Sequence, residues 1–183
     1  MRVIAGSAKG KRIESIEGIL TRPTLDRVKE AMFGSIQFEL PGADVLDLFG
    51  GSGALAIEAL SRGARSAVVN DKNPACVKMI EKNLSACGFS DKARVTCEDF
   101  VALIGRLSRT EKRFGFVFID APYADGTGRE AMELCFRNDL VSEDGCVILE
   151  HSRSEVPTAA EGLCELVKTK NYGKCAFSVY KRL

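Results

Sequence analysis

Short apolar runs alternate with amphipathic segments along most of this chain of 183 residues. The pattern predicts buried strands near 44–49, 66–70, 93–97, 114–120 and 145–151, and helices near 53–63, 74–87, 98–107 and 128–138. Two more strands, roughly 163–170 and 174–181, are expected on either side of a turn at Asn171-Tyr172-Gly173. Strands that alternate with helices predict an α/β fold with a doubly wound, mostly parallel, seven-stranded sheet.

The start of the chain has a different pattern. Residues 2–5 and 12–13 predict a small β-hairpin around residues 6–10, and Thr24 is expected to cap a helix that runs to about Leu40. Pro41-Gly42 would end that helix. We therefore expect a single domain over 1–183, with an N-terminal extension over 1–40 and a core of alternating strands and helices over 41–183.

Composition fits a globular protein, with 45% hydrophobic and 28% charged residues. The sequence shows no apolar run of membrane-spanning length and no signal-peptide pattern, so a soluble, cytoplasmic protein is expected. Seven cysteines form no C-x-x-C pair, and there is one histidine. We expect most of the cysteines to be reduced core residues, and no metal site.

The net charge of +1 is low for a nucleic-acid-binding protein, but the basic residues cluster at one end. Arg2, Lys9, Lys11 and Arg12 lie in a stretch without acids, and Arg22 and Arg27 follow. Charge alone supports a solvated face and an RNA contact equally well.

Asp120-Ala121-Pro122-Tyr123 follows the apolar run 116–119 and so stands at the end of a predicted buried strand. Asp120 can accept one N–H of a planar amino group, the Ala121 carbonyl can accept the other, and Tyr123 offers an aromatic face to a base. Pro122 fixes the backbone between them. An ordinary turn would use the same residue types.

A glycine-rich segment, Gly50-Gly51-Ser52-Gly53, joins a predicted strand that contains Asp47 to a predicted helix. This arrangement is typical of a nucleotide-cofactor site, and Asp71 follows at about the spacing of an acid that binds ribose hydroxyls. The spacing Gly51-x-Gly53-x-x-Ala56 also satisfies the dinucleotide fingerprint. Asp47 and the glycines after it resemble instead the acidic first motif of S-adenosylmethionine-dependent methyltransferases.

Matches in order along the whole chain resemble the RsmD-like family of small-subunit (16S) ribosomal RNA guanine-N2 methyltransferases. The residues that carry this resemblance are Met1–Gly6, Thr21–Thr24, Asp26–Phe33, Asp47–Leu55, Glu58–Ala64, Asp120–Tyr123, Glu150–Ser152 and Tyr172-Gly173. The resemblance implies a class I, Rossmann-like methyltransferase fold with S-adenosyl-L-methionine as cofactor.

The resemblance also implies roles for individual residues. The cofactor would be held by Asp47, Phe49, Gly50, Gly51, Ser52 and Gly53, with Asp71 on the ribose and Asp99 and Phe100 at the adenine. Asp99 is expected equally to be the N-cap of the next helix. Asp120, Ala121, Pro122 and Tyr123 would hold the target guanine, and Arg2, Lys9, Lys11, Arg12, Arg22, Thr24 and Arg27 would contact RNA. The expected partner is small-subunit ribosomal RNA or the assembling 30S subunit, with no membrane or metal and a monomeric protein.

Two positions depart from the family pattern. Ala121 stands where members usually have a proline, and Gly50 stands where alanine is common, which is expected to loosen the loop. Three alternatives remain: methylation of adenine N6, methylation of a protein glutamine, and a non-catalytic RNA-binding or assembly factor.

Overall fold

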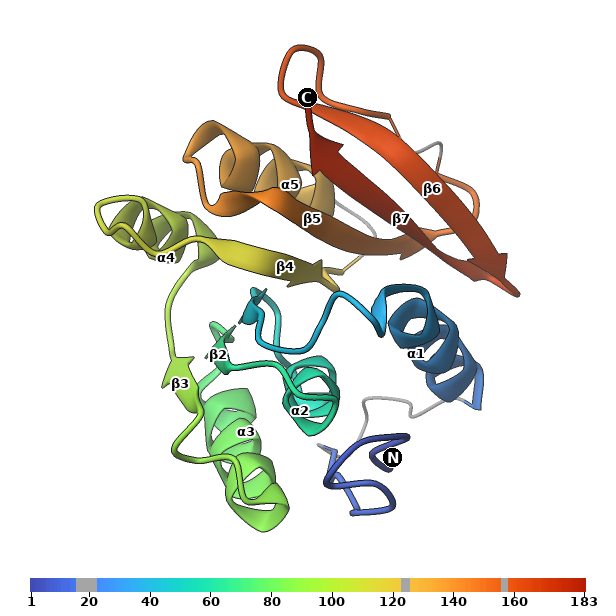
Figure 1. Cartoon of the computed structure of the whole chain (residues 1–183), viewed down its shortest axis with the longest axis vertical. Helices are drawn as coiled ribbons and strands as arrows, with labels where there is room; N and C mark the ends of the chain where they lie inside the picture. Colours follow the sequence, from blue (N-terminus) through green and yellow to red (C-terminus); the bar gives the residue numbers. More distant parts are fainter. Residues whose placement is uncertain (16–22, 123–125, 156–157) are drawn as a thin grey trace.

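The computed structural model describes residues 1–15, 23–122, 126–155 and 158–183, with the side chains of 23–27 left out of the description. Seven strands form one sheet in the order β3-β2-β1-β4-β5-β7-β6 (Figure 1). The strands are β1 Asp44–Asp47, β2 Ser66–Asn70, β3 Ala93–Thr96, β4 Phe114–Ile119, β5 Val141–Ser152, β6 Cys164–Tyr172 and β7 Cys175–Arg182. The helices are α1 Pro23–Ile36, α2 Ala54–Ser61, α3 Pro74–Cys87, α4 Phe100–Leu107 and α5 Thr127–Arg137.

The chain winds outward from β1 in both directions. β1 pairs in parallel with β2 on one side and with β4 on the other, and β3 and β5 extend the parallel sheet outward. β7 is antiparallel to both β5 and β6. The strand order therefore reverses between β1 and β4, which is where open α/β sheets bind their ligands. The predicted doubly wound, mostly parallel sheet is confirmed.

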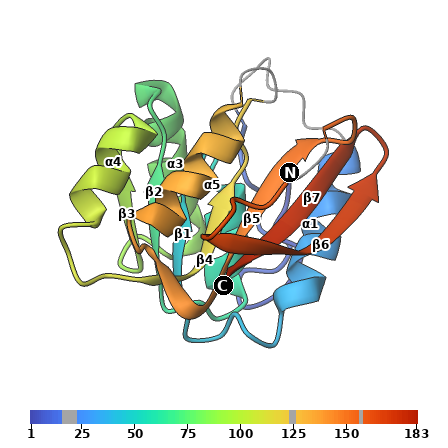
Figure 2. The same cartoon turned by 90° about the horizontal axis from the view of Figure 1, so that it is seen from above.

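Helices cover both faces of this sheet (Figure 2). One hydrophobic cluster packs α1, α2 and α3 against the sheet, and the other packs α4 and α5 against the opposite face. Side chains alternate between the two clusters along β1, β2, β4 and β5. In β4, Phe116 and Phe118 join the first cluster, whereas Val117 and Ile119 join the second.

Helix ends follow local capping chemistry. The side chain of Asn73 accepts a hydrogen bond from the N–H of Ala75 and caps α3, whose first residue is Pro74. α1 ends at Ile36, earlier than the predicted Leu40, because the N–H groups of both Glu39 and Leu40 turn back to the Ile36 carbonyl. Thr24 lies in the first turn of α1 and is therefore not at the predicted cap position.

Three other predicted boundaries differ. A single antiparallel bridge, Arg2 to Arg12, replaces the predicted N-terminal hairpin of two strands. β5 begins at Val141, because Val141 pairs with Phe114 before the register shifts. Tyr172 belongs to β6 and pairs with Cys175, so the late turn begins one residue after it.

Residues 1–15, called here the N-terminal segment, are fastened to α2 by a buried carboxylate. Glu58 accepts hydrogen bonds from the N–H groups of Ile4 and Ala5 at 2.8 and 3.0 Å. Its second set of partners is cationic, with Arg62 at 2.8 Å and Lys29 of α1 at 3.5 Å. A fully buried acid thus joins three parts of the chain that are distant in sequence.

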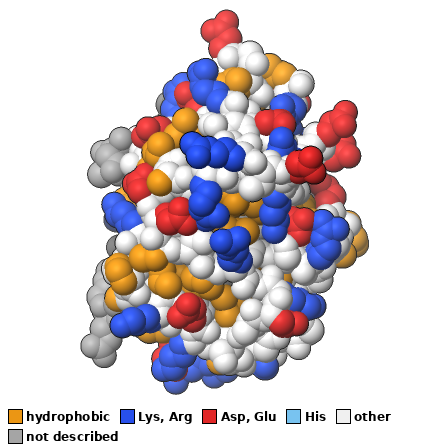
Figure 3. Space-filling model, turned by 90° about the vertical axis from the view of Figure 1, so that its left-hand side faces the viewer, with side chains coloured by type: hydrophobic (Ala, Val, Ile, Leu, Met, Phe, Trp, Pro, Cys, Tyr) orange, Lys and Arg blue, Asp and Glu red, His pale blue; other side chains and the backbone are white. Residues whose placement is uncertain are grey.

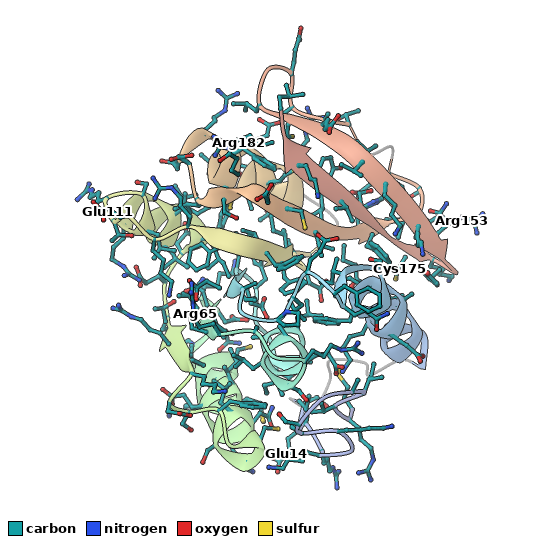
Figure 4. The ribbon with its side chains drawn as sticks, in the orientation of Figure 1. Glu14, Arg65, Glu111, Arg153, Cys175 and Arg182 are labelled. Carbon is teal, nitrogen blue, oxygen red and sulfur yellow. The ribbon has the colours of Figure 1, made fainter. Side chains whose placement is uncertain are left out.

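Gly6 fixes how closely the segment approaches α2. Its φ is +84°, and a Cβ added there would lie 1.8 Å from the carbonyl oxygen of Ser61. Only glycine fits this contact. At its far end, the segment is tied to α3 through Glu14, which lies beside that helix in Figure 4 and pairs with Lys82 at 2.6 Å.

Five of the seven cysteines are buried and all seven are free thiols, which confirms that most are core residues. None of the described helices is long and apolar enough to cross a lipid bilayer.

Candidate active site

A cavity of about 550 Å³ opens at the carboxyl ends of the parallel strands. This volume is typical of a small-molecule site. Its lining includes ten of the predicted cofactor and catalytic residues: Phe49, Gly50, Gly51, Ser52, Asp71, Asp99, Phe100, Asp120, Ala121 and Pro122. Asp47 and Gly53 are not in the lining, and Tyr123 lies outside the described residues.

The glycine bend, residues 50–53, forms one wall of the cavity. Gly51 has a φ of +55°, and a Cβ there would meet no atom within 4 Å, so its backbone faces open space. The N–H groups of Gly50, Gly51 and Gly53 donate to Asn70, Asp71 and Gly50, respectively. These three N–H groups are therefore occupied, and the bend supplies mainly shape.

Gly50 does not loosen the bend as expected. A Cβ at this position would lie 2.8 Å from Cγ1 of Val69 and 2.9 Å from Cδ1 of Ile80. These two core side chains fill the space where alanine would place its methyl group. The bend is therefore closely packed on the side of Val69 and Ile80.

Asp71 is held in place by two backbone groups. Its Oδ2 accepts from the N–H of Gly51 at 2.9 Å, and its Oδ1 accepts from the N–H of Asn73 at 2.8 Å. A carboxylate has about four acceptor positions, so these bonds orient the group and leave it able to accept from two hydroxyls. This is the chemistry that a ribose requires.

The adjacent strand ends are tied together by Asn70. Its side-chain amide donates to the carbonyls of Leu48 and Glu98 at 3.2 and 3.0 Å, and its Oδ1 accepts from Thr96 at 2.9 Å. The ends of β1, β2 and β3 are thereby held in a fixed arrangement. The sequence analysis did not identify Asn70, although it is the last residue of a predicted strand.

Asp99, which follows β3, caps α4 by accepting a hydrogen bond from the N–H of Val101 at 2.9 Å. The predicted N-cap is confirmed. Asp99 also lines the cavity, so the two interpretations of this residue are compatible. Beside it, the rings of Phe49 and Phe100 lie with their centroids 5.4 Å apart and form an apolar wall.

Asp47 is buried at the end of β1, with 1% of its surface exposed. Neither carboxylate oxygen makes a hydrogen bond of normal geometry within the described part of the chain. Desolvation raises its pKa to about 7, although the backbone N–H groups of Ala56 and Phe49 lower it and Asp71 adds a further rise. A buried carboxylate without hydrogen-bond partners destabilises the empty protein. A positive charge close to β1 would offset this cost.

Asp120 follows β4, on the other side of β1 from β2. Desolvation by the surrounding cavity walls raises its pKa well above the ordinary value, and the carboxylates of Glu150 and Asp47 raise it further. Its side chain nevertheless has open surface toward the cavity. Water that reaches this carboxylate through the cavity limits the size of the rise in its pKa.

The rest of the cavity wall comes from residues that the sequence analysis did not assign to the site. Met1 and Ser15 of the N-terminal segment, and Lys29 and Met32 of α1, complete one side. Glu150 of β5 and Thr127 of α5 lie on the side nearer Asp120. Glu150 could have been found by the strand-end rule that identified Asp120, but Lys29 could not, because only the folded chain brings α1 to the cavity.

The predicted RNA-binding residues that the structure describes are on the surface. Arg2, Lys9, Lys11 and Arg12 are all exposed on the N-terminal segment. Figure 3 shows Lys and Arg side chains at the lower end of the molecule, the end at which Figure 1 places this segment and α3. Arg22 lies outside the described residues, as do the side chains of Thr24 and Arg27. Among the residues described, no group of three His, Cys, Asp or Glu is placed to hold a metal ion.

Comparisons with known proteins agree with this geometry. The family model described as "Conserved hypothetical protein 95" matches residues 1–181. The chain is 33% identical to "Putative rRNA methyltransferase YlbH" of Bacillus subtilis, covering 100% of this chain and 99% of that protein. It is 28% identical to "Ribosomal RNA small subunit methyltransferase D" of Escherichia coli, with 100% and 90% covered.

A solved structure, "Putative methyltransferase yhhF from Escherichia coli", matches with a TM-score of 0.85 and 28% identity, over 100% of this chain and 97% of that one. The resemblance to the RsmD-like family is thus supported by a family model, by relatives and by fold, and the class I Rossmann-like architecture is confirmed. The chain is similar to ribosomal RNA small subunit methyltransferase D, and it belongs to the family described as Conserved hypothetical protein 95.

Proposed function

We propose that this protein is an S-adenosyl-L-methionine-dependent methyltransferase that methylates the exocyclic N2 of a guanine in small-subunit (16S) ribosomal RNA. One observation carries the proposal. A single cavity joins the glycine bend and Asp71 to Asp120, Ala121 and Pro122 across the reversal in strand order. The relatives named for ribosomal RNA methylation support the same activity.

The cofactor half of the cavity lies over β3, β2 and β1. When bound, S-adenosyl-L-methionine supplies an electrophilic methyl group on a sulfonium centre. Asp71 is oriented to accept from ribose hydroxyls, Phe49 and Phe100 would contact the adenine, and the open backbone at Gly51 leaves room for the chain between them. Asp47, buried without a hydrogen-bond partner near this bend, provides negative charge that suits a cation.

The acceptor half lies over β4 and β5. A guanine N2 amine is a weak nucleophile, because its lone pair is delocalised into the ring. Asp120 and the Ala121 carbonyl would each accept one hydrogen of the amine, and the anion would stabilise the positive charge that develops on nitrogen. Pro122, at the cavity wall, limits the freedom of this backbone. Stacking of the base on Tyr123 remains a prediction.

The N-terminal segment supplies the RNA contacts in this proposal. Its exposed cations, Arg2, Lys9, Lys11 and Arg12, belong to the same segment as Met1 and Ser15, which line the cavity. Phosphate contacts there would position the RNA, while the cavity would select the base. We propose a monomeric protein that acts in the cytoplasm on RNA of the assembling 30S subunit.

The test is methyl transfer from labelled cofactor to small-subunit RNA and to assembled subunits, followed by analysis of the product nucleoside. We expect N2-methylguanosine. N6-methyladenosine, or label in protein glutamine, would favour those alternative acceptors. Binding of RNA without any transfer of label would favour the non-catalytic assembly factor.

A further inference from the structure

Glu150 occupies a place in the cavity that the transfer reaction described above does not use. Ile119 of β4 is in register with Leu149 of β5, and both strands run in the same direction. Asp120 and Glu150 are therefore the next pair of neighbours, on adjacent strands about 4.8 Å apart. Both residues line the cavity.

The two carboxylates also share a face of the sheet. Phe118 and Ile148 pack in the cluster beneath α1, α2 and α3, whereas Ile119 and Leu149 pack on the opposite face. Because side chains alternate along a strand, Asp120 and Glu150 point back to the side of Phe118 and Ile148. The carboxylate of Glu150 raises the pKa of Asp120, which agrees with this proximity.

The pair gives the acceptor half of the cavity two anionic acceptors side by side. Guanine presents adjacent donors along its Watson–Crick edge, N1–H and the N2 amine. Adenine presents its N6 amine beside N1, which is an acceptor and would face a carboxylate with like polarity. Two neighbouring carboxylates therefore fit guanine and disfavour adenine.

We propose that Glu150 is the specificity-determining residue for the target base, and that its carboxylate accepts N1–H of the guanine while Asp120 holds the N2 amine. This inference rests on the proposed function and deepens it, since it identifies the group that selects the base. Lys29 lines the same cavity but is also engaged by the Arg2 carbonyl at 3.0 Å and by Glu58. Lys29 thus helps to hold the N-terminal segment, whereas Glu150 is assigned to recognition of the base.

The experiment first locates the methylated guanosine in small-subunit RNA and then uses fragments with one changed base at that position. One fragment carries guanosine and the other 2-aminopurine riboside, which keeps the 2-amino group but has an acceptor at N1. For the wild-type protein we expect kcat/KM to be lower for 2-aminopurine by about 10- to 150-fold, as loss of one hydrogen bond to a charged group implies.

The decisive variant is Glu150→Gln, whose amide can offer an N–H to N1 of 2-aminopurine. We expect the preference for guanosine to fall at least tenfold in this variant. Glu143→Gln makes the same chemical change at an exposed position of the same strand and should leave the preference unchanged. Glu150→Ala, which removes the acceptor, should also lower the preference, so the inference stays testable if the glutamine variant does not fold.

The outcomes separate the inference from the proposed function. Absence of transfer to the guanosine fragment by folded wild-type protein would contradict the function itself. Transfer to guanosine with no discrimination against 2-aminopurine would overturn only the role of Glu150. The same holds if discrimination is undiminished in folded Glu150 variants that bind the cofactor normally.

Discussion

The buried carboxylate of Asp47 lowers the stability of the cofactor-free protein. Its pKa is about 7, against an ordinary value of 3.8, because desolvation by burial outweighs the backbone N–H groups of Ala56 and Phe49, which lower it. The native state therefore holds this proton over a pH range in which the unfolded chain has released it. By linkage, the stability that depends on the proton is present below about pH 4 and is lost as the pH rises through 7.

We predict that Asp47→Asn stabilises the cofactor-free protein at pH 8 but not at pH 4. A shift of this size corresponds to an upper limit on the order of 4 kcal/mol in the free energy of unfolding. Urea unfolding at the two pH values measures the difference between variant and wild type. Asp144→Asn, which neutralises an exposed acid, should show no such pH dependence. An equal effect of Asp47→Asn at both pH values would contradict the assignment.

For Asp120 we predict that replacement by Asn lowers kcat by about 10²- to 10³-fold while cofactor affinity stays within a factor of two, because the missing charge acts on the developing positive nitrogen. Single-turnover transfer and calorimetric titration of the cofactor measure the two quantities. A variant as fast as wild type would refute the role of the carboxylate.

The pH profile provides a separate prediction. Burial, Glu150 and Asp47 raise the pKa of Asp120, and Lys29 and Lys72 are cations in the same cavity wall. Since the ionised form is the acceptor, kcat/KM should fall as the pH falls through this raised pKa. Removing the like charge with Glu150→Gln should move that acid limb to lower pH. A limb that does not move would show that another group controls it.

At the scale of elements, the N-terminal segment, α1 and α2 depend on one another through Glu58. Its side chain is fully buried, and Lys29 and Arg62 are 4% and 11% exposed. Removing one member of a buried ion pair leaves the remaining charges without compensation. The segment that carries the basic cluster is thus part of the cooperative structure.

We predict that Glu58→Gln destabilises the protein by about 3–5 kcal/mol, because Lys29 and Arg62 lose their anion. The N–H groups of Ile4 and Ala5 donate to different oxygens of Glu58, so only one of them keeps an acceptor in the glutamine variant. Denaturant unfolding measures the change. Glu130→Gln, an exposed acid in α5, is the matched control and should change stability by less than about 0.5 kcal/mol. An effect as small as that of the control would show that the segment is held by other interactions.

Elements whose formation is decided locally could be predicted from the sequence. The strands and helices of the core follow from apolar runs, and the cap at Asp99 from its position before α4. The single bridge of the N-terminal segment could not, because contacts with distant residues such as Ser61 and Glu58 decide it. The same distinction between local and distant contacts decides which residues of the site could be predicted. Strand-end residues were identifiable, whereas the wall contributed by Lys29 and Met32 depends on how α1 packs.

For the whole molecule, a net charge of +1 conceals a separation of charge. Basic residues without acids occupy positions 1–12, so RNA affinity should depend on this end of the molecule more than on the total charge. RNA affinity should then fall with salt in proportion to the phosphates neutralised.

We predict that replacing Lys9 and Arg12 together by Gln weakens binding to small-subunit RNA. It should also reduce the slope of log affinity against log salt by about 0.7–0.9 for each phosphate that the variant no longer neutralises. Fluorescence anisotropy over a series of salt concentrations gives both values. Replacing two exposed cations elsewhere, Arg109 and Lys174, should leave the slope unchanged. Equal effects of the two double variants would indicate binding by overall charge.

The strand order has a consequence for ligand design. Because β1, β4 and β5 are neighbours in that order, the glycine bend and Glu150 are two strand spacings apart, about 10 Å. A compound that tethers an adenosine to a purine through a linker of this length would engage both halves of the cavity at once. Its affinity would exceed that of either fragment, because binding of the first raises the effective concentration of the second.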